Sequence, residues 1–248
     1  MHRTLEVPLD SLDAALLAAP FADRLELCDD LSSEGWTPTM ELIRAVRDGI
    51  DISRTQIVSM IRPRSANDSP NLDVAAFTTT PAILDDCRRE IEASARAGAH
   101  SVAVGLLTPD GHVDMEACGS MATLARECGL IVAFLRTFDL LTDRARGMDD
   151  ITALGMTRVV TAGVLGWDAS VLTLAQRLVV LSQDVERAAR AAQAHGTTPV
   201  DVVPGGGVRA SNAADFLTVS PHLHASCRRD GAISGAELQA LRGVFAES

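Results

Sequence analysis

Short apolar runs alternate with longer amphipathic segments along the whole chain, and this alternation limits the possible folds more than any other feature of the sequence. Apolar runs of about four to eight residues indicate buried strands, and apolar residues at helical spacing between them indicate helices that cover a sheet. Strands are predicted over residues 4–9, 23–28, 56–61, 101–107, 130–135, 157–163, 200–207 and 222–227. Helices are predicted near residues 10–20, from residue 38, and over 81–97, 114–128, 142–154, 170–195 and 234–247.

Eight strands that alternate with helices over 248 residues are typical of a (β/α)8 barrel, or TIM barrel, of the α/β class. An open, doubly wound sheet is the alternative fold for such an alternation. No linker divides the chain, so residues 1–248 are predicted to form a single domain. Asp10 or Ser11 is expected to cap the first helix, which carries Leu12, Leu16 and Leu17 on one apolar side.

Charge and composition exclude several classes of partner. The sequence has 22 basic and 33 acidic residues, a formal net charge of -11, whereas nucleic-acid binding requires a basic surface. Aromatic residues make up only 3% of the chain, so few side chains are available to stack on bases. No apolar run approaches the ~20 residues of a membrane span, and charges occupy the place of a signal peptide's apolar stretch. We therefore expect a cytoplasmic protein that binds neither nucleic acid nor membrane.

Active sites of (β/α)8 barrels lie at the C-terminal ends of the strands, which we call the barrel mouth. Charged groups within strands are costly to bury unless they are paired, so we expect opposite charges at these ends to meet. The candidate site consists of the following residues at or near the predicted strand ends: Glu6, Glu26, Cys28, Arg62, Arg64, Arg136, Asp139, Thr161, Gly205, Gly206, Gly207 and His224.

The glycine run Gly205, Gly206 and Gly207, in the stretch "VVPGGGVRASN", predicts an anion site. Glycines let backbone N–H groups approach a ligand closely, and a helix start after them adds a positive dipole end. Thr161 is expected to supply a further donor. The alternative interpretation is a tight turn that requires positive φ and binds nothing.

Three arginines favour the same anionic ligand. Arg62, Arg64 and Arg136 can each make forked contacts with a carboxylate or a phosphate. Glu6 belongs to the same predicted ligand-binding set. The alternative is that the arginines pair with Glu6, Glu26 and Asp139, and so satisfy the charges of the barrel interior.

His224, Glu26 and Asp139 are the candidates for proton transfer, because an imidazole titrates near neutral pH and a neighbouring carboxylate can raise its pKa. A hydrogen-bonded structural histidine is the alternative. Cys28 is the candidate metal ligand or nucleophile, and the alternative for it is a buried thiol. The five cysteines are scattered without a CxxC pair, which favours free thiols and argues against structural zinc.

Several segments, taken in order, resemble the CutC copper-homeostasis family of (β/α)8 barrels. They are "LEVPLDSLDAAL", "ADRLELCDDLSSEGWTPTMELI", "MIRPR", "LLTPDGHVDMEAC", "FLRTFD", "LGMTRVVTAG", "VPGGGVRASN" and "LHASC". The resemblance covers most of the chain and implies a cytosolic, commonly homo-oligomeric protein that is linked to copper handling and Cu(I) binding.

The chain departs from that family pattern at three places. Pro8 stands where the family's EVC motif has a cysteine, and Leu135 and Thr137 stand where FHRAFD has histidine and alanine. A GDF-like loop is replaced by "SANDSP". Cu(I) prefers thiolate, thioether and imidazole ligands, so two soft ligands are missing and Cys28 is left nearly alone. The resemblance therefore implies weaker Cu(I) binding than in relatives that keep them.

Three functions follow from the sequence. The first is a CutC-like copper-homeostasis protein. The second is an enzyme of the lyase or isomerase type that acts on a phosphorylated or carboxylated small molecule. The third is a non-catalytic descendant that binds a ligand, and the sequence alone does not decide between catalysis and binding.

Overall fold

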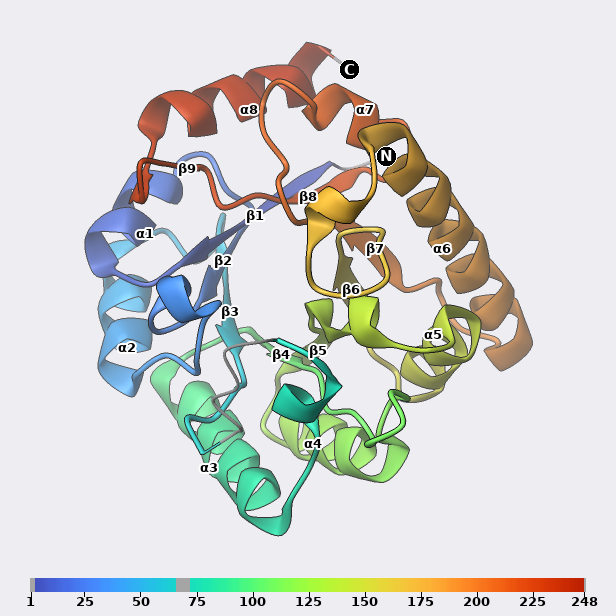
Figure 1. Cartoon of the computed structure of the whole chain (residues 1–248). Coiled ribbons are helices and arrows are strands. Elements are labelled where there is room, and N and C mark those ends of the chain that lie inside the picture. The colour runs from blue at the N-terminus through green and yellow to red at the C-terminus, as the bar shows by residue number, and fades with distance from the viewer. Residues whose placement is uncertain (1–2, 66–71, 248) are drawn as a thin grey trace.

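The computed structural model describes residues 3–65 and 72–247. Eight parallel strands form a central barrel that a ring of helices surrounds (Figure 1). The strands are β1 (Thr4–Leu9), β2 (Arg24–Leu27), β3 (Gln56–Met60), β4 (Ser101–Val104), β5 (Ile131–Phe134), β6 (Arg158–Thr161), β7 (Asp201–Pro204) and β8 (His222–His224). A hairpin of β9 (Arg228–Arg229) and β10 (Ala232–Ile233) follows them.

The helices alternate with the strands as the sequence predicts. They are α1 (Leu12–Ala18), α2 (Met40–Gly49), α3 (Pro81–Ala97), α4 (Met115–Glu127), α5 (Arg144–Ala153), α6 (Leu174–His195), α7 (Ala213–Leu217) and α8 (Gly235–Glu247). Short 3-10 turns lie in the loops: η1 (Leu31–Ser33), η2 (Val74–Phe77), η3 (Arg136–Leu140) and η4 (Ala169–Val171). No helix in the described ranges is both long and apolar enough to cross a membrane.

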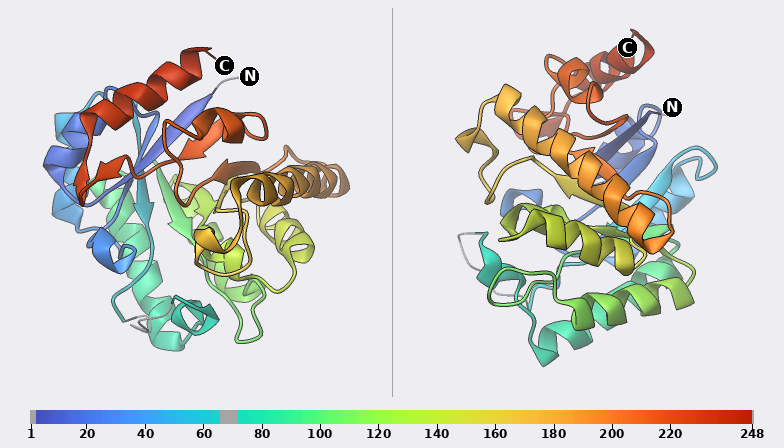
Figure 2. Two further views of the ribbon diagram at one scale, coloured as in Figure 1. Left: turned by 45° about the horizontal axis from the view of Figure 1, so that its top comes forward. Right: turned by 90° about the vertical axis from the view of Figure 1, so that its right-hand side faces the viewer.

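Strand pairing confirms the predicted barrel over the open sheet. The hydrogen-bonded order runs from β7 through β6, β5, β4, β3, β2 and β1 to β8, and β7 contacts β8 to close the ring. The views in Figure 2 show the helices outside this ring of strands. In the outer layer of helices, α8 lies beside α1. Most strands end a few residues before the predicted limits, because the chain leaves the sheet there to form the loops of the mouth.

Local capping chemistry explains where the helices begin. The side chain before each of α1 to α6 accepts a hydrogen bond from a backbone N–H of the first turn, which satisfies a donor that the helix leaves free. These N-cap residues are Ser11, Thr39, Thr80, Asp114, Asp143 and Thr173. Gly98 and Gly196 end α3 and α6 with positive φ.

Successive strand residues point to opposite sides of the barrel wall. In β1, Leu5, Val7 and Leu9 belong to the large apolar core between strands and helices, whereas Glu6 ion-pairs with arginines of β2 and β6. A smaller apolar cluster lies apart from the large core and comes mainly from the strands and their ends: Cys28, Val58, Met60, Ala103, Ala133 and Leu135. The barrel therefore combines a charged region around Glu6 with an apolar one around Met60.

Two sequence-based expectations about local structure were wrong. The buried residues of α1 are Ala14, Ala15 and Ala18, and the predicted apolar side is largely exposed at Leu16 and Leu17. Small side chains let this short helix lie close to the barrel wall. The expected helix after the glycine run begins only at Ala213 and has five residues, so no helix dipole reaches the glycines. Most of the "SANDSP" segment falls on residues 66–71, outside the described ranges.

Candidate functional site at the barrel mouth

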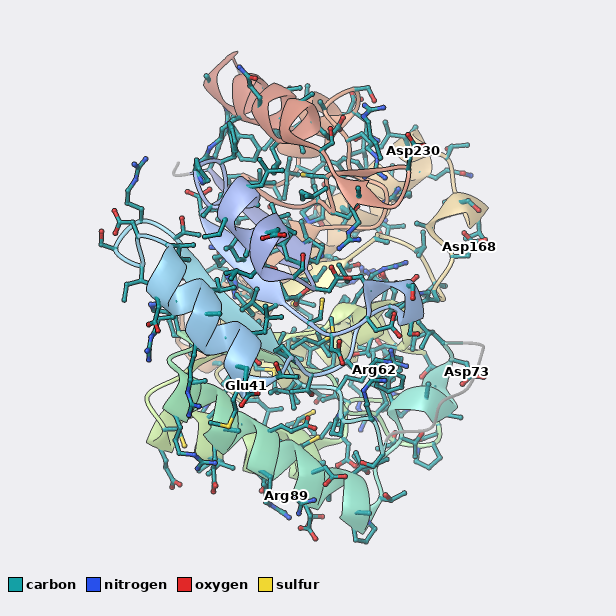
Figure 3. All side chains as sticks on the ribbon, turned by 90° about the vertical axis from the view of Figure 1, so that its left-hand side faces the viewer. Glu41, Arg62, Asp73, Arg89, Asp168 and Asp230 are labelled. Atoms are coloured by element: carbon teal, nitrogen blue, oxygen red, sulfur yellow. The ribbon has the colours of Figure 1, made fainter. Side chains whose placement is uncertain are left out.

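A cavity of about 800 Å³ opens at the barrel mouth. Its lining includes residues from the ends of β1, β2, β3, β6 and β8 and from the loops that follow the strands. The charged and polar members of the lining are Glu26, Glu34, Arg62, Arg136, Thr137, Asp168, His224, Ser226 and Arg228. Asp73, Asp168 and Asp230, from three different loops, lie on one side of the molecule, and Arg62 lies farther in (Figure 3).

Glu6 is the centre of a buried ion network beneath the cavity. Its Oε2 accepts a hydrogen bond from Arg24 Nε at 2.9 Å and lies 3.1 Å from Arg158 Nη1. Its Oε1 lies 3.1 Å from His224 Nδ1. Burial opposes ionisation of Glu6, but Arg158, His224 and Arg24 together hold its pKa well below the usual range. Glu6 is therefore a carboxylate that can only accept, and His224 carries its proton on Nδ1.

Glu26 and His224 present two titratable groups to the cavity. His224 Nε2 lies 3.8 Å from Glu26 Oε2, too long for a direct hydrogen bond. Burial raises the pKa of Glu26 to about 7, and the charge of Glu6 adds to this against the opposing effect of His224. Burial lowers the pKa of His224, but the hydrogen bond to Glu6 and the charge of Glu26 outweigh it, so the net shift is upward. Glu26 can thus exchange a proton near neutral pH, and the imidazole beside it favours its charged form.

Arg136 is held at the cavity by Asp139. Its Nε donates to Asp139 Oδ2 at 3.2 Å, and its Nη2 donates to the carbonyl oxygen of Trp167. Asp139 is fully buried and also accepts from Arg144, Thr161 Oγ1 and the N–H of Ala162. Asp139 therefore acts on the cavity through Arg136 and not by contact.

The glycine turn lines the cavity next to Arg136. Gly206 and Gly207 have φ of +65° and +81°, and both belong to the lining. Behind the turn, Arg177 Nη2 donates to the carbonyl oxygens of Gly205 and Gly206 at 2.7 and 2.8 Å. In the described structure, no hydrogen bond occupies the N–H of Gly206 or Gly207. Two donors therefore remain for a ligand.

Positive charge exceeds negative charge around this turn. The charged groups around it are four arginines and three aspartates: Arg136, Arg144, Arg177, Arg187, Asp139, Asp168 and Asp184. This excess of positive charge, and not the predicted helix dipole, makes the electrostatic potential at the turn positive. An anion at Gly206 and Gly207 would lie in a favourable field.

Close packing at Gly206 gives the first testable prediction. A β-carbon there would lie 2.9 Å from Ala162 Cβ and 3.3 Å from Ala169 Cβ, whereas one at Gly196, with φ of +66°, meets nothing within 4 Å. Both alanine variants pay the same cost for a left-handed backbone, ~1–2 kcal/mol. Gly206→Ala should lose about a further 1–3 kcal/mol in urea unfolding because its site is overpacked. Equal losses in the two variants would show that the turn is not closely packed.

The structure brings together part of the predicted site. Glu26 and His224 line the cavity with Arg62, Arg136, Gly206 and Gly207. The lining does not include Glu6, Cys28, Arg64, Asp139, Thr161 or Gly205. Arg64 pairs with Asp29 at 2.5 Å outside the cavity, and Arg62 donates to the carbonyl oxygens of Ser33 and Gly35.

Among the described lining residues, the soft donors for a metal are the Met60 thioether and the His224 imidazole, and no thiolate joins them. Cys28 is fully buried, its Sγ donates to the carbonyl oxygen of Leu9, and burial raises its pKa far above the usual range. Pro8 and Leu135, the two departures from the family pattern, both line the cavity and offer no ligand atom. The described residues contain no group of three His, Cys, Asp or Glu side chains that could hold a metal ion.

Sequence reasoning missed several residues of the site. Trp167, Phe77 and Arg228 line the cavity, and Arg158 fixes Glu6 from β6. Arg158 follows the rule that charges inside strands must pair, and it stands in a predicted strand, so that rule was the signal that could have found it. Trp167 and Phe77 lie in loops whose placement no local pattern indicates.

Comparison with known proteins finds CutC proteins by sequence and by structure. The sequence model of the CutC family matches residues 3–228. A CutC family protein of Vibrio atlanticus is 32% identical over 229 residues, which cover 91% of this chain and 82% of that protein. The human copper homeostasis protein cutC homolog is 32% identical over 227 residues, covering 90% and 73%. The crystal structure of CutC from Streptococcus agalactiae superimposes with a TM-score of 0.75 at 23% identity, covering 90% of this chain and 98% of that one.

Proposed function

This chain belongs to the CutC family, and we propose that its barrel mouth binds a small organic anion and exchanges a proton with it. The observation that carries the proposal is one shared cavity. Arg136 and the free N–H groups of Gly206 and Gly207 line it together with Glu26 and His224. When Arg136 and the two glycine N–H groups hold a carboxylate or phosphate, the rest of the molecule lies in the cavity, where it faces Glu26 and His224.

Proton exchange is the work of Glu26 and His224 in this proposal. At neutral pH Glu26, with a pKa of about 7, is present in both protonation states and can give or take a proton. Glu6 holds the Nδ1 proton of His224, so that Nε2 remains to accept one. Lyase or isomerase chemistry on the bound anion needs such a pair, and the same site without a reactive substrate would serve for binding alone.

Anion titration of Arg136→Met tests the proposal. A charge-assisted hydrogen bond contributes ~1.5–3 kcal/mol, which corresponds to a loss of affinity of roughly 10- to 100-fold. We expect acetate and inorganic phosphate, followed by NMR, to bind the wild type and to bind this variant that much more weakly. Asp139 keeps Arg144, Thr161 and the N–H of Ala162 as partners, so the variant should fold.

Arg64→Met is the matched control, because this arginine pairs with Asp29 and does not line the cavity. It should bind both anions like the wild type. Equal affinity of all three proteins would contradict the proposed anion site.

Copper binding is the second candidate function, favoured by the name of the human relative. We propose that Cu(I) binds this chain only weakly, because the Cys28 thiol is buried with a raised pKa and Pro8 and Leu135 offer no ligand. The soft donors left in the lining are the Met60 thioether and the His224 imidazole. In competition with a Cu(I) chelator, Cys28→Ser should then behave like the wild type. A tight one-to-one complex that this single change abolishes would establish the copper function instead.

A further inference from the structure

We propose that the anion bound at the mouth carries a planar aromatic ring, and that this ring packs against Trp167 and Phe77. The inference rests on the proposed anion site and adds the class of ligand. Trp167 and Phe77 stack with ring centroids 5.8 Å apart and an angle of 22° between the planes, and both rings belong to residues of the cavity lining.

Arginine side chains pack against the aromatic rings along this part of the mouth. Arg136 Cζ lies 4.6 Å from the Trp167 ring centroid, and Arg62 Cζ lies 5.2 Å from that of Phe77 and 4.1 Å from that of Trp36. The group that binds the anion in our proposal is therefore in direct contact with an aromatic ring. A ligand whose charge meets Arg136 has an aromatic surface beside it for the rest of its body.

Aromatic residues are too scarce in this chain for the stack to follow from composition. The sequence contains six phenylalanines, two tryptophans and no tyrosine. Trp167 and Phe77 line the cavity, and Trp36 is buried against Arg62, whereas Phe134, Phe138 and Phe216 are fully buried in the core. Apolar side chains complete the lining around the stack: Pro8, Leu31, Met60, Leu72, Leu135 and Val160.

Unpartnered polar atoms at the same place indicate a ligand. Trp167 Nε1 and Arg228 Nε are buried and have no hydrogen-bond partner among the described residues, although both side chains line the cavity. Buried N–H groups are almost always bonded, so each of these donors lacks an acceptor that an oxygen of the ligand would supply. A stack that served only to hold Arg136 in place would not require a free indole N–H.

The test uses Trp36→Phe, in which Trp167 is the one remaining tryptophan, so its fluorescence reports on the cavity. The probes are two matched pairs of anions, with and without a ring: benzoate against acetate, and phenyl phosphate against inorganic phosphate. Stacking of a ring on one aromatic side chain increases binding affinity by about 10- to 100-fold. We expect the ring-bearing anions to bind that much more tightly and to change the fluorescence of Trp167.

Trp167→Leu and Phe77→Leu provide the second measurement, with binding followed by NMR. Each variant should lose most of the gain from the ring, measured within that variant as the ratio of its affinities for phenyl phosphate and inorganic phosphate. Two variants on different loops guard against misfolding of either one.

The outcomes separate this inference from the proposed function. Equal binding of each pair overturns the aromatic ligand and leaves the anion site standing. Binding of none of the four anions overturns both. Benzyl alcohol that binds as tightly as phenyl phosphate would show a ring site without an anion site, and would contradict the proposed function.

Discussion

Glu6→Gln should destabilise the folded protein by about 3–5 kcal/mol, because it removes one partner of a buried ion network and leaves charges uncompensated. Arg24 and Arg158 both contact the Glu6 carboxylate, and all three side chains are at least nine-tenths buried. A neutral amide has the size of the carboxylate but cannot balance two guanidinium groups. Urea unfolding at pH 7 measures the loss.

Glu92→Gln is the control for that measurement. Glu92 pairs with Arg96 at i, i+4 on the exposed surface of α3, and such pairs contribute less than about 0.5 kcal/mol. The double variant Glu6→Gln with Arg158→Met should recover part of the lost stability, because it removes one of the two guanidinium groups left without a carboxylate. A loss below about 1 kcal/mol in Glu6→Gln would contradict the network as the structure shows it.

The same variant also tests whether Glu6 positions His224. The hydrogen bond and the charge of Glu6 both raise the pKa of His224. The pKa of His224 should therefore fall in Glu6→Gln. NMR titration of the imidazole would show this fall. A structural role alone would leave the imidazole titration unchanged.

Local sequence patterns predicted the limits of helices and strands well, but they predicted poorly which residues of an element face its neighbours. Thr80 and Pro81 mark the start of α3 and Gly98 its end, and the predicted range 81–97 agrees with the structure. The buried side of α1 was wrong, because it depends on which neighbours the helix meets and not on its own pattern. Alanines fit that contact, while Leu16 and Leu17 stay largely exposed.

The candidate site divides in the same way. Glu26, His224 and Arg136 were correctly predicted to lie at the mouth. They stand at or near predicted strand ends, and all parallel strands of the barrel end on one side. The partners of Glu6 could not be assigned, because Arg158 lies far along the chain, on a strand that does not pair with β1, and meets Glu6 only in the closed barrel. The aromatic content of the sequence likewise gave no indication that Trp167 and Phe77 meet at the mouth.

Glu26→Gln should make the protein more stable above pH 7, with an effect on the order of 3 kcal/mol at pH 8. Burial raises the pKa of Glu26 from about 4.5 in the unfolded chain to about 7 in the folded protein. The folded state therefore binds this proton more tightly. The resulting stability is fully present below pH 4.5 and is lost as the pH rises through 7. Glutamine resembles the protonated acid at every pH, so the variant avoids this loss.

Urea unfolding of wild type and Glu26→Gln between pH 5 and 8.5 measures the effect. The difference between them should be below about 1 kcal/mol at pH 5 and should widen toward pH 8. Glu41→Gln, at an exposed position of α2, should follow the wild type throughout. A difference that does not change with pH would mean that Glu26 titrates like an ordinary carboxylate. In that case it could not share a proton with a ligand at neutral pH, and the proton exchange proposed for the mouth would have to rest on His224 alone.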